Sequence, residues 1–318
     1  MTKILLTGAT GLFGRYFTES NPSPSKFEIV CTSRRTTMDV LADGVVAHVT
    51  LPFTDREGYR ALLDRARPDV IVHAGAEGSV DEVERAPLDA MDTNLAFPQF
   101  LMEEANRRQA RLIHFSSNAV YGGEHAPYDE NAELDPVNQY GRFKRAVDEA
   151  MRAELHRWTL VRPIVAYGWN YSSGRANPVT HFLPRLMRSE VTPLVVDQQE
   201  NPVYAGDVAE VLWRVITRGY CGEVNVAGGD SSLSRHEWIR RAAVAFSIPT
   251  ESLREARVRD FSALARRPRD TSFVTERLTR DLGIVPRTVA EGSRLMSDDV
   301  GRRHFGAQGA GTNAMTHW

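Results

Sequence analysis

Tyr140 and Lys144, in the stretch "QYGRFK" (139–144), are the residues whose types and spacing most clearly indicate chemistry. Of the 39 lysines and arginines only three are lysines, so Lys144 stands where the composition favours arginine. Residues four apart share a helix face, and a nearby cation lowers a phenol's pKa from its usual value of about 10. A lysine can reach both the phenol and a ribose hydroxyl, whereas the arginine fork is larger and directed differently. The pair predicts a tyrosine that exchanges a proton with a substrate oxygen, or else a purely structural contact.

A pair of serines follows the fifth predicted strand, in "FSSNAVYGG" (115–123). Ligands of an open parallel sheet bind at the carboxyl ends of its strands, where Ser116 and Ser117 are expected. A serine hydroxyl there can hold a carbonyl oxygen and share a hydrogen bond with Tyr140. The alternative is that the two serines only cap a loop.

Three glycines, Gly8, Gly11 and Gly14, lie in "TGATGLFG", directly after the first predicted strand and at the start of a helix. In this context the first glycine permits a tight turn, the second the close approach of a pyrophosphate, and the third close packing of helix on strand. The free N–H groups of the helix N-terminus then attract the phosphates. The stretch predicts a dinucleotide-binding turn rather than an ordinary one.

The second predicted strand ends in "CTSRR", so that Ser33, Arg34 and Arg35 stand where an acidic residue usually holds the ribose of NAD. A carboxylate would repel a 2′-phosphate, whereas arginine pairs with it through two hydrogen bonds. The sequence therefore favours NADP(H) over NAD(H), unless the two arginines are only solvated surface residues.

The elements that must position these residues alternate between strands and helices over the first 165 residues. Near-continuous apolar runs predict parallel strands, and apolar residues at helical spacing predict the helices between them. The strands are expected at 3–8, 27–32, 45–50, 69–75, 111–117 and 158–163, and the helices at 12–20, 55–66, 86–109 and 140–156. This alternation predicts an α/β fold with a doubly wound parallel sheet of the Rossmann type.

After residue 165 the pattern loosens, and we expect a smaller C-terminal substrate subdomain. A loop is predicted at 166–178, a helix at 179–189, a further helix at 204–219, a strand at 222–229 and mostly helix from there to about 300. The NADP-binding domain is assigned to 1–165 plus 200–228 and the substrate subdomain to 166–199 plus 229–305. The Gly- and Ala-rich end, 306–318, is expected to be a flexible tail.

The overall composition excludes several classes of protein. A net charge of −2 and a pI near 6.5 give no electrostatic case for binding nucleic acid or an anionic membrane. No apolar run approaches the ~20 residues of a membrane span, and we expect no signal peptide. Cys31 and Cys221 suggest no disulfide framework, and His73, His114 and His181 lack metal-ligand spacing, so no metal is expected. A cytoplasmic enzyme is the expectation.

Together, the glycine turn, Ser117 and Tyr140-x-x-x-Lys144 resemble the extended short-chain dehydrogenase/reductase superfamily, over nearly the whole chain to about residue 300. The stretches "RPDVIVHAGA" (67–76), "DTNLAFPQFL" (92–101) and "RPIVAYG" (162–168) support this. Within the superfamily the chain looks most like the dTDP-4-dehydrorhamnose reductase family. That likeness is carried by 78–87, 195–212, 224–242 and "RRPRDTSFVTERLTRDLGI" (266–284).

The resemblance implies NADPH-dependent reduction of the 4-keto group of a nucleotide-linked, dTDP-type deoxysugar. It implies Tyr140 as general acid, Lys144 as the cation that lowers the pKa of Tyr140 and binds ribose, and Ser117 as the group that orients the carbonyl. The cofactor-binding residues that follow are Gly8, Thr10, Gly11, Leu12, Phe13, Gly14, Ser33, Arg34, Arg35, Ala74, Gly75, Ala76, Asn94, Ser116, Tyr140, Lys144 and Pro163. The substrate-binding residues that follow are Val80, Ser117, Asn118, Arg267 and Arg269.

Two other functions stay open at this point. The first is a nucleotide-sugar epimerase or dehydratase that retains its NAD(P), although such enzymes usually carry an acidic residue after the second strand. The second is an NADP-binding regulatory subunit without turnover, against which an intact Ser–Tyr–Lys set argues. By analogy with the superfamily, a homodimer through 86–109 and 140–156 is also possible.

Overall fold

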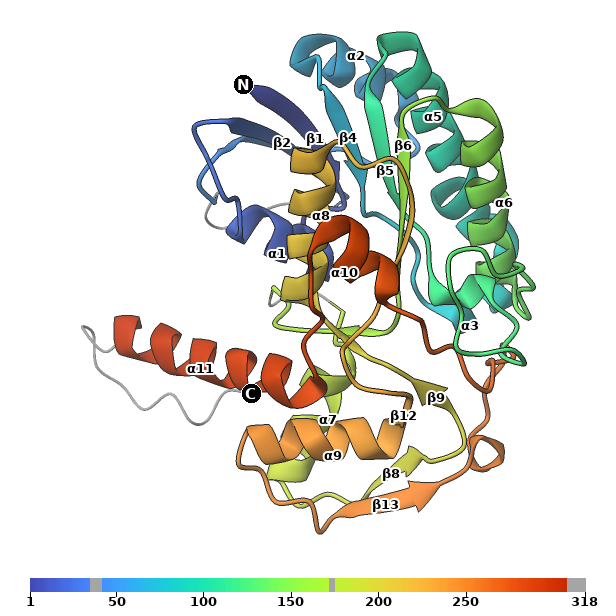
Figure 1. Ribbon diagram of the computed structural model, residues 1–318, viewed down its shortest axis with the longest axis vertical. Coiled ribbons are helices and arrows are strands. Elements are labelled where there is room, and N and C mark those ends of the chain that lie inside the picture. The colour runs from blue at the N-terminus through green and yellow to red at the C-terminus, as the bar shows by residue number, and fades with distance from the viewer. Residues whose placement is uncertain (35–41, 172–174, 308–318) are drawn as a thin grey trace.

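The computed structural model describes residues 1–34, 42–171 and 175–307 (Figure 1). Arg35 lies outside the described residues, as does the expected tail from 308 onward. Positions 306 and 307 of that tail end the last helix, α11 (Val289–Ala307).

A seven-stranded sheet forms the centre of the larger layer, with the strand order β11-β6-β5-β4-β1-β2-β3. Every neighbouring pair of these strands is parallel. The strands are β1 (Thr2–Thr7), β2 (Phe27–Ser33), β3 (Val45–Thr50), β4 (Val70–His73), β5 (Arg111–Phe115), β6 (Trp158–Pro163) and β11 (Gly222–Val226). The predicted doubly wound parallel sheet is confirmed. Its order reverses beside β1, and ligands bind at such a switch point.

Helices cover both faces of the sheet (Figure 1). One face packs on α1 (Leu12–Glu19), α8 (Ala205–Arg218) and α10 (Glu276–Leu282). The other packs on α2 (Arg56–Ala66), α5 (Phe97–Arg108) and α6 (Gln139–Glu154). Successive residues of a strand point to opposite faces, so Ile4 and Leu6 enter the first core and Leu5 the second. This two-sided burial explains why the strands are almost wholly apolar in sequence.

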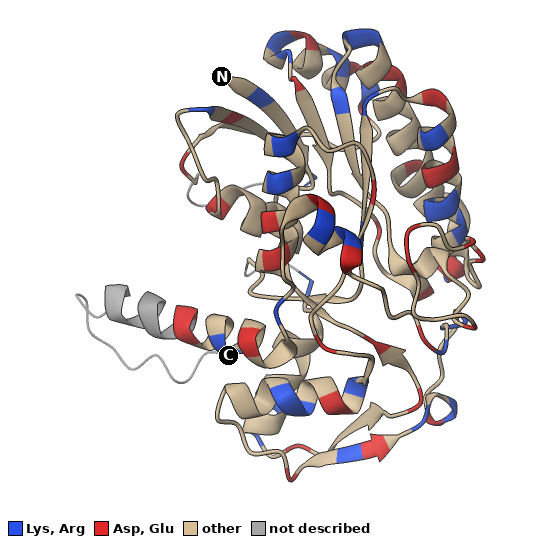
Figure 2. Ribbon diagram, in the orientation of Figure 1, with Lys and Arg blue, Asp and Glu red and all other residues tan. Residues whose placement is uncertain are grey.

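The predicted helix over 86–109 consists of three consecutive segments. They are α4 (Pro87–Met91), a π-helical segment (Asp92–Ala96) and α5. A short helix that was not predicted, α3 (Val80–Arg85), precedes them. It is capped by Ser79, whose hydroxyl accepts a hydrogen bond from the Glu82 N–H. Both acidic and basic residues lie on α5 and α6 (Figure 2), and some of them pair, as Arg145 and Glu149 do at 2.7 Å. Within the described ranges, every helix is too short or too polar to span a bilayer.

A smaller layer is built around a third apolar core that includes Trp238, Leu183 and Leu253. It contains α7 (Pro178–Met187), α9 (Arg235–Ala245), the start of α11 and a parallel pair, β8 (Thr192–Val195) with β13 (Leu253–Ala256). Two-residue strands complete it: β7 (Ala166–Tyr167) pairs with β10 (Val203–Tyr204), and β9 (Gln199–Glu200) pairs with β12 (Leu233–Ser234).

The prediction of mostly helix from 230 to 300 is wrong for its middle part. Residues 253–256 form β13, and 261–275 contain no helix. "LREA" consists of good helix formers, but Leu253 and Ala256 are buried against the smaller layer and pair with β8. Tertiary pairing outweighs intrinsic propensity here.

Candidate active site

The glycine turn after β1 has the geometry that the sequence predicts. Gly8 has φ +76°, and a Cβ atom on it would lie 2.7 Å from the backbone nitrogen of Gly75. A Cβ atom on Gly14 would lie 2.5 Å from the carbonyl oxygen of Ala9. Gly11 is the N-cap of α1, and its N–H donates to the Gly8 carbonyl at 2.9 Å, which closes the turn. Gly8 and Gly14 therefore allow close backbone packing, and the residues at the start of α1 line an open cavity.

The first cavity runs from this turn to the end of β2. Its lining comes from the turn, from Ser33 and Arg34 after β2, from Phe53, and from the segment after β4. Ser33 Oγ is hydrogen-bonded to His48 Nε2 at 2.9 Å, and the Arg34 guanidinium lies 5.9 Å from the centre of the Phe53 ring. The described end of β2 thus offers a hydroxyl and a guanidinium where an NAD site usually offers a carboxylate.

A second cavity, of about 500 Å³, adjoins the first and shares Thr10, Gly11 and Ala76 with it. Ser117 enters it from the end of β5, and Tyr140 and Lys144 enter it from the first turns of α6. Leu12, Phe13, Ser116, Asn118, Val80 and Pro163 also line it. The residues predicted from separate motifs therefore meet around one space, next to the glycine turn.

The start of α6 is fixed by Asn138, the residue before it. The Asn138 side chain accepts the Gly141 N–H at 2.9 Å and donates to the carbonyl of Arg266 at 3.0 Å. This cap satisfies a backbone donor that would otherwise be unpaired, and it sets where Tyr140 and Lys144 point.

Tyr140 and Lys144 are both buried, and burial dominates their protonation. Burial raises the pKa of Tyr140 to about 12, opposed by a hydrogen bond to Ser117 and by the charge of Arg175. Burial also lowers the pKa of Lys144 to about 8, opposed by the negative charge of Asp148. The Lys144 ammonium lies 5.8 Å from the centre of the Tyr140 ring and donates to the Phe115 carbonyl at 2.7 Å.

The sequence predicts a lowered pKa for Tyr140, whereas in this structure the pKa is raised. Loss of water from around the phenol outweighs the hydrogen bond to Ser117 and the charge of Arg175. The consequence is that Tyr140 keeps its proton at neutral pH, which is the state that a proton donor needs.

The two serines differ in their contacts. Ser117 Oγ accepts the Ala119 N–H at 3.1 Å and donates to Asn118 Oδ1 at 3.3 Å, at the edge of the cavity. Ser116 Oγ donates to the buried Asp148 at 2.8 Å, so its hydroxyl is engaged in the interior.

Asn94 and Arg269, two other predicted site residues, line neither of these cavities among the described residues. The Asn94 side chain accepts the Glu77 N–H at 2.9 Å and donates to the Glu77 carbonyl at 3.1 Å. It holds the segment after β4 in place. Arg269 is exposed, and its carbonyl accepts the Gln199 N–H at 2.8 Å.

Arg267 lines the second cavity, and its charge is partly balanced by Asp81, which sequence reasoning missed. Arg267 Nη2 donates to Asp81 Oδ2 at 2.9 Å, and the Ala265 N–H donates to the other oxygen at 2.9 Å. Burial favours a higher pKa for Asp81, but these two donors hold it below its ordinary value. Asn118 Nδ2 similarly donates to Thr271 Oγ1 at 2.8 Å. The 265–271 segment is thus fastened to the rim of the cavity.

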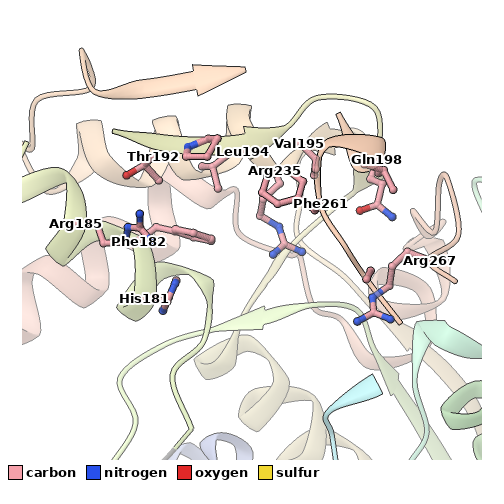
Figure 3. Close-up of a pocket in the computed structure, with 13 residues that line it drawn as sticks. His181, Phe182, Arg185, Thr192, Leu194, Val195, Gln198, Arg235, Phe261 and Arg267 are labelled. Carbon is pink, nitrogen blue, oxygen red and sulfur yellow. The ribbon is translucent and has the colours of Figure 1, made fainter. Parts of the chain in front are cut away.

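A third cavity, of about 440 Å³, lies in the smaller layer and meets the second at Arg267, which lines both. Phe182 extends from α7 toward Arg235, and Arg267 lies at the far end (Figure 3). Arg235 is paired with Glu200 at 2.8 Å. His181 and Arg185 complete the basic lining.

Two other histidines lie inside the sheet. His73 and His114 are neighbours on β4 and β5, with ring centres 5.2 Å apart, and His73 Nδ1 is hydrogen-bonded to Thr7 Oγ1 at 2.6 Å. Burial, together with the charge of Lys144, lowers the pKa of both rings. Across the described ranges, no group of three or more His, Cys, Asp or Glu residues could hold a metal ion.

A family model described as the RmlD substrate binding domain matches residues 1–301. The chain belongs to this family. This membership confirms the family resemblance read from the sequence motifs.

Proteins similar to this chain differ in their names and roles. A dTDP-4-dehydrorhamnose reductase of Aggregatibacter actinomycetemcomitans is 25% identical over 297 residues, covering 90% of this chain and 95% of its own. The methionine adenosyltransferase 2 subunit beta of Xenopus tropicalis is 30% identical over 261 residues, covering 79% and 74%. The solved structure of a Bacillus anthracis dTDP-4-dehydrorhamnose reductase in complex with NADP matches with a TM-score of 0.83 at 21% identity, covering 94% of this chain and 100% of its own.

Proposed function

We propose that this protein uses NADPH to reduce the 4-keto group of a nucleotide-linked deoxysugar. The observation that carries the proposal is the cavity in which Ser117, Tyr140 and Lys144 meet beside the glycine turn. A buried proton donor next to a dinucleotide cradle is the arrangement that carbonyl reduction requires.

The described residues fit a dinucleotide. Gly8 lets the turn pack closely on the backbone of Gly75, and Gly11, which has no side chain, lines the first cavity where a pyrophosphate would approach. Ser33 and Arg34 would hold a 2′-phosphate, and Lys144 would donate to a ribose hydroxyl. When bound, NADPH supplies a hydride from its nicotinamide ring.

The chain's own part in the reaction is to bind the carbonyl and to deliver a proton. The Ser117 hydroxyl would donate to the carbonyl oxygen and stabilise the negative charge that develops there. Tyr140, protonated because it is buried, would give its proton to that oxygen. The positive charge of Lys144 would stabilise the phenolate that remains.

We place the nucleotide part of the substrate in the third cavity. Its basic side chains, Arg185, Arg235 and Arg267, suit a diphosphate, and Phe182 offers a ring on which a base can stack. Arg267 lines both cavities, so a substrate extending from one to the other would pass it.

The test is to mix the purified protein with NADPH and a panel of dTDP- and UDP-linked 4-keto-6-deoxyhexoses and to follow the loss of NADPH absorbance. We expect consumption with at least one sugar, reduced by about 100- to 10,000-fold in Tyr140→Phe, the usual range for loss of a general acid or base. NADPH binding should be retained in the variant. Tight NADPH binding by the wild type without consumption of any sugar in the panel would contradict the proposal.

One observation favours a second candidate, an NADP-binding regulatory subunit. It is the similarity, at 30% identity, to a protein named as a subunit of methionine adenosyltransferase. A subunit of this kind should bind NADPH without consuming it, and its effect on a partner enzyme should be unchanged in Tyr140→Phe. An epimerase with retained cofactor is the third possibility, and it would convert its substrate without net loss of NADPH.

A further inference from the structure

Asp148 lies one helical turn beyond Lys144, so Tyr140, Lys144 and Asp148 occupy the same side of α6. The Asp148 side chain is fully buried, yet no motif in the sequence draws attention to it. A buried carboxylate is costly unless something compensates its charge, so its partners are informative.

The contacts of Asp148 link it to two strands. Its Oδ2 accepts a hydrogen bond from Ser116 Oγ at 2.8 Å and another from Arg162 Nε at 2.9 Å. Its Oδ1 is buried and accepts no hydrogen bond from the described residues. One oxygen of Asp148 is therefore held by residues at the sheet, and the other accepts no hydrogen bond from the described residues.

Arg162 favours the charged form of this carboxylate. The Arg162 side chain is fully buried on β6 and also pairs with Glu223 of β11 at 2.6 Å. Burial raises the pKa of Asp148, whereas the Arg162 guanidinium and the Ser116 hydroxyl oppose that rise. Because a guanidinium does not lose its proton near neutral pH, its buried partners must supply the balancing negative charge.

Few other groups near Lys144 favour its protonated form. His73 and His114 face it from β4 and β5 and are uncharged, since burial and Lys144 itself lower their pKa values. Tyr140 is uncharged at neutral pH as well. Among the described groups that act on Lys144, Asp148 alone carries a charge that favours the ammonium.

We infer that Asp148 is a positioning residue that keeps Lys144 protonated behind Tyr140 and holds Ser116 at the end of β5. The inference rests on the proposed function for the use made of Lys144, but the protonation of Lys144 can be measured without turnover. Asp148 acts through its charge and not by direct pairing, so the Lys144 ammonium, which has three donors, keeps donors for the cavity.

The scarcity of lysine makes a direct test possible. In protein labelled with ¹³C-lysine, the three lysines give three Cε signals, and that of Lys144 is the one missing from Lys144→Met. We expect its titration near pH 8 in the wild type and at least about one unit lower in Asp148→Asn, the scale of a close opposite charge. Asp148→Glu, which keeps the charge, should restore most of the difference.

Glu223→Gln is the matched control. It also removes a buried negative charge that pairs with Arg162, but Glu223 is not among the groups that shift Lys144. A Lys144 titration that stays in place in Asp148→Asn, or that moves as far in Glu223→Gln, would overturn the inference. If Asp148→Asn does not fold, the wild type still decides: titration of Lys144 below about pH 6 would show that nothing holds its charge.

Turnover provides an independent readout. If Lys144 must be protonated for reduction, the alkaline loss of kcat should move to lower pH in Asp148→Asn by the same interval as the NMR titration. A purely structural defect would lower kcat at all pH values without moving this limb. The NMR result stands even if no sugar of the panel is reduced, so failure of the proposed function and failure of this inference can be told apart.

Discussion

Replacement of Lys144 by Met should stabilise the protein at neutral pH while abolishing its activity. The folded chain keeps an ammonium that burial disfavours, and the pKa of Lys144 falls from 10.5 to about 8 as a result. At about 1.4 kcal/mol per pKa unit, this is a cost of roughly 3 kcal/mol to the folded state. The variant loses the hydrogen bond from Lys144 to the Phe115 carbonyl, which offsets this gain by about 1 kcal/mol. Methionine fills similar space, so no cavity is expected. The expected net gain for Lys144→Met is about 2 kcal/mol at pH 7.

The pH dependence of this gain identifies its cause. Below pH 8 the lysine is protonated in both states, so the cost is present in full. Between about pH 8 and 10.5 the folded state releases the proton first, the unfolded state binds more protons, and wild-type stability rises. The advantage of Lys144→Met should therefore shrink over this interval and vanish near its upper end.

Urea unfolding followed by far-UV circular dichroism measures the difference in unfolding free energy between the two proteins from pH 6 to 10. The matched control is Lys26→Met, because Lys26 is exposed and its removal should change stability little at any pH. A Lys144→Met protein that is less stable than wild type at pH 7 would refute the reasoning. So would a gain that is the same at pH 7 and pH 10.

Three further outcomes are expected. Arg34→Asp should weaken NADPH binding by about 10- to 100-fold and NADH binding much less, measured by fluorescence titration; equal losses would contradict a 2′-phosphate contact. Arg267→Met should raise the KM for the sugar nucleotide about tenfold and leave the affinity for NADPH unchanged. The control, Arg269→Met, removes an exposed side chain and should change this KM by less than about twofold. Equal effects of the two substitutions would exclude Arg267 from the substrate site. Asn94→Leu leaves the Glu77 backbone groups unpaired and should lower the unfolding free energy by about 1–3 kcal/mol, with weaker NADPH binding; an unchanged protein would show that this clamp is dispensable.

The sheet and the glycine turn could be predicted because their signals are local. Several strands of the main sheet are nearly continuous apolar runs, and the turn at Gly8 needs a residue that tolerates φ +76°. Tyr140 and Lys144 belong to a single helix, so their proximity also follows from their spacing. The direction of the Tyr140 pKa shift does not follow from this spacing. It depends on burial, and therefore on segments such as α3 and 117–120 that pack around the phenol.

The third cavity could not be predicted for a related reason. Its walls come from α7, β8, α9 and the segment 258–267, which share no motif. The third core joins α7, β8 and α9 by tertiary packing alone. The ion pair between Asp81 and Arg267 joins residues far apart in the sequence, and neither position has a spacing that indicates the other. The strand at 253–256 was missed because its residues favour helix and only its neighbour β8 decides otherwise.

Asn138 has a mechanical consequence, because the same side-chain amide that caps α6 also holds the carbonyl of Arg266. The segment that contains Arg266 is thereby hydrogen-bonded to the cap of the helix that carries Tyr140. A hinge movement that carried residues 265–271 away from the larger layer would strain or release this hydrogen bond and fray the start of α6. Together with the contacts of Asp81 and Asn118, the Asn138 amide therefore couples the position of the 265–271 segment to the start of the helix that carries the proton donor.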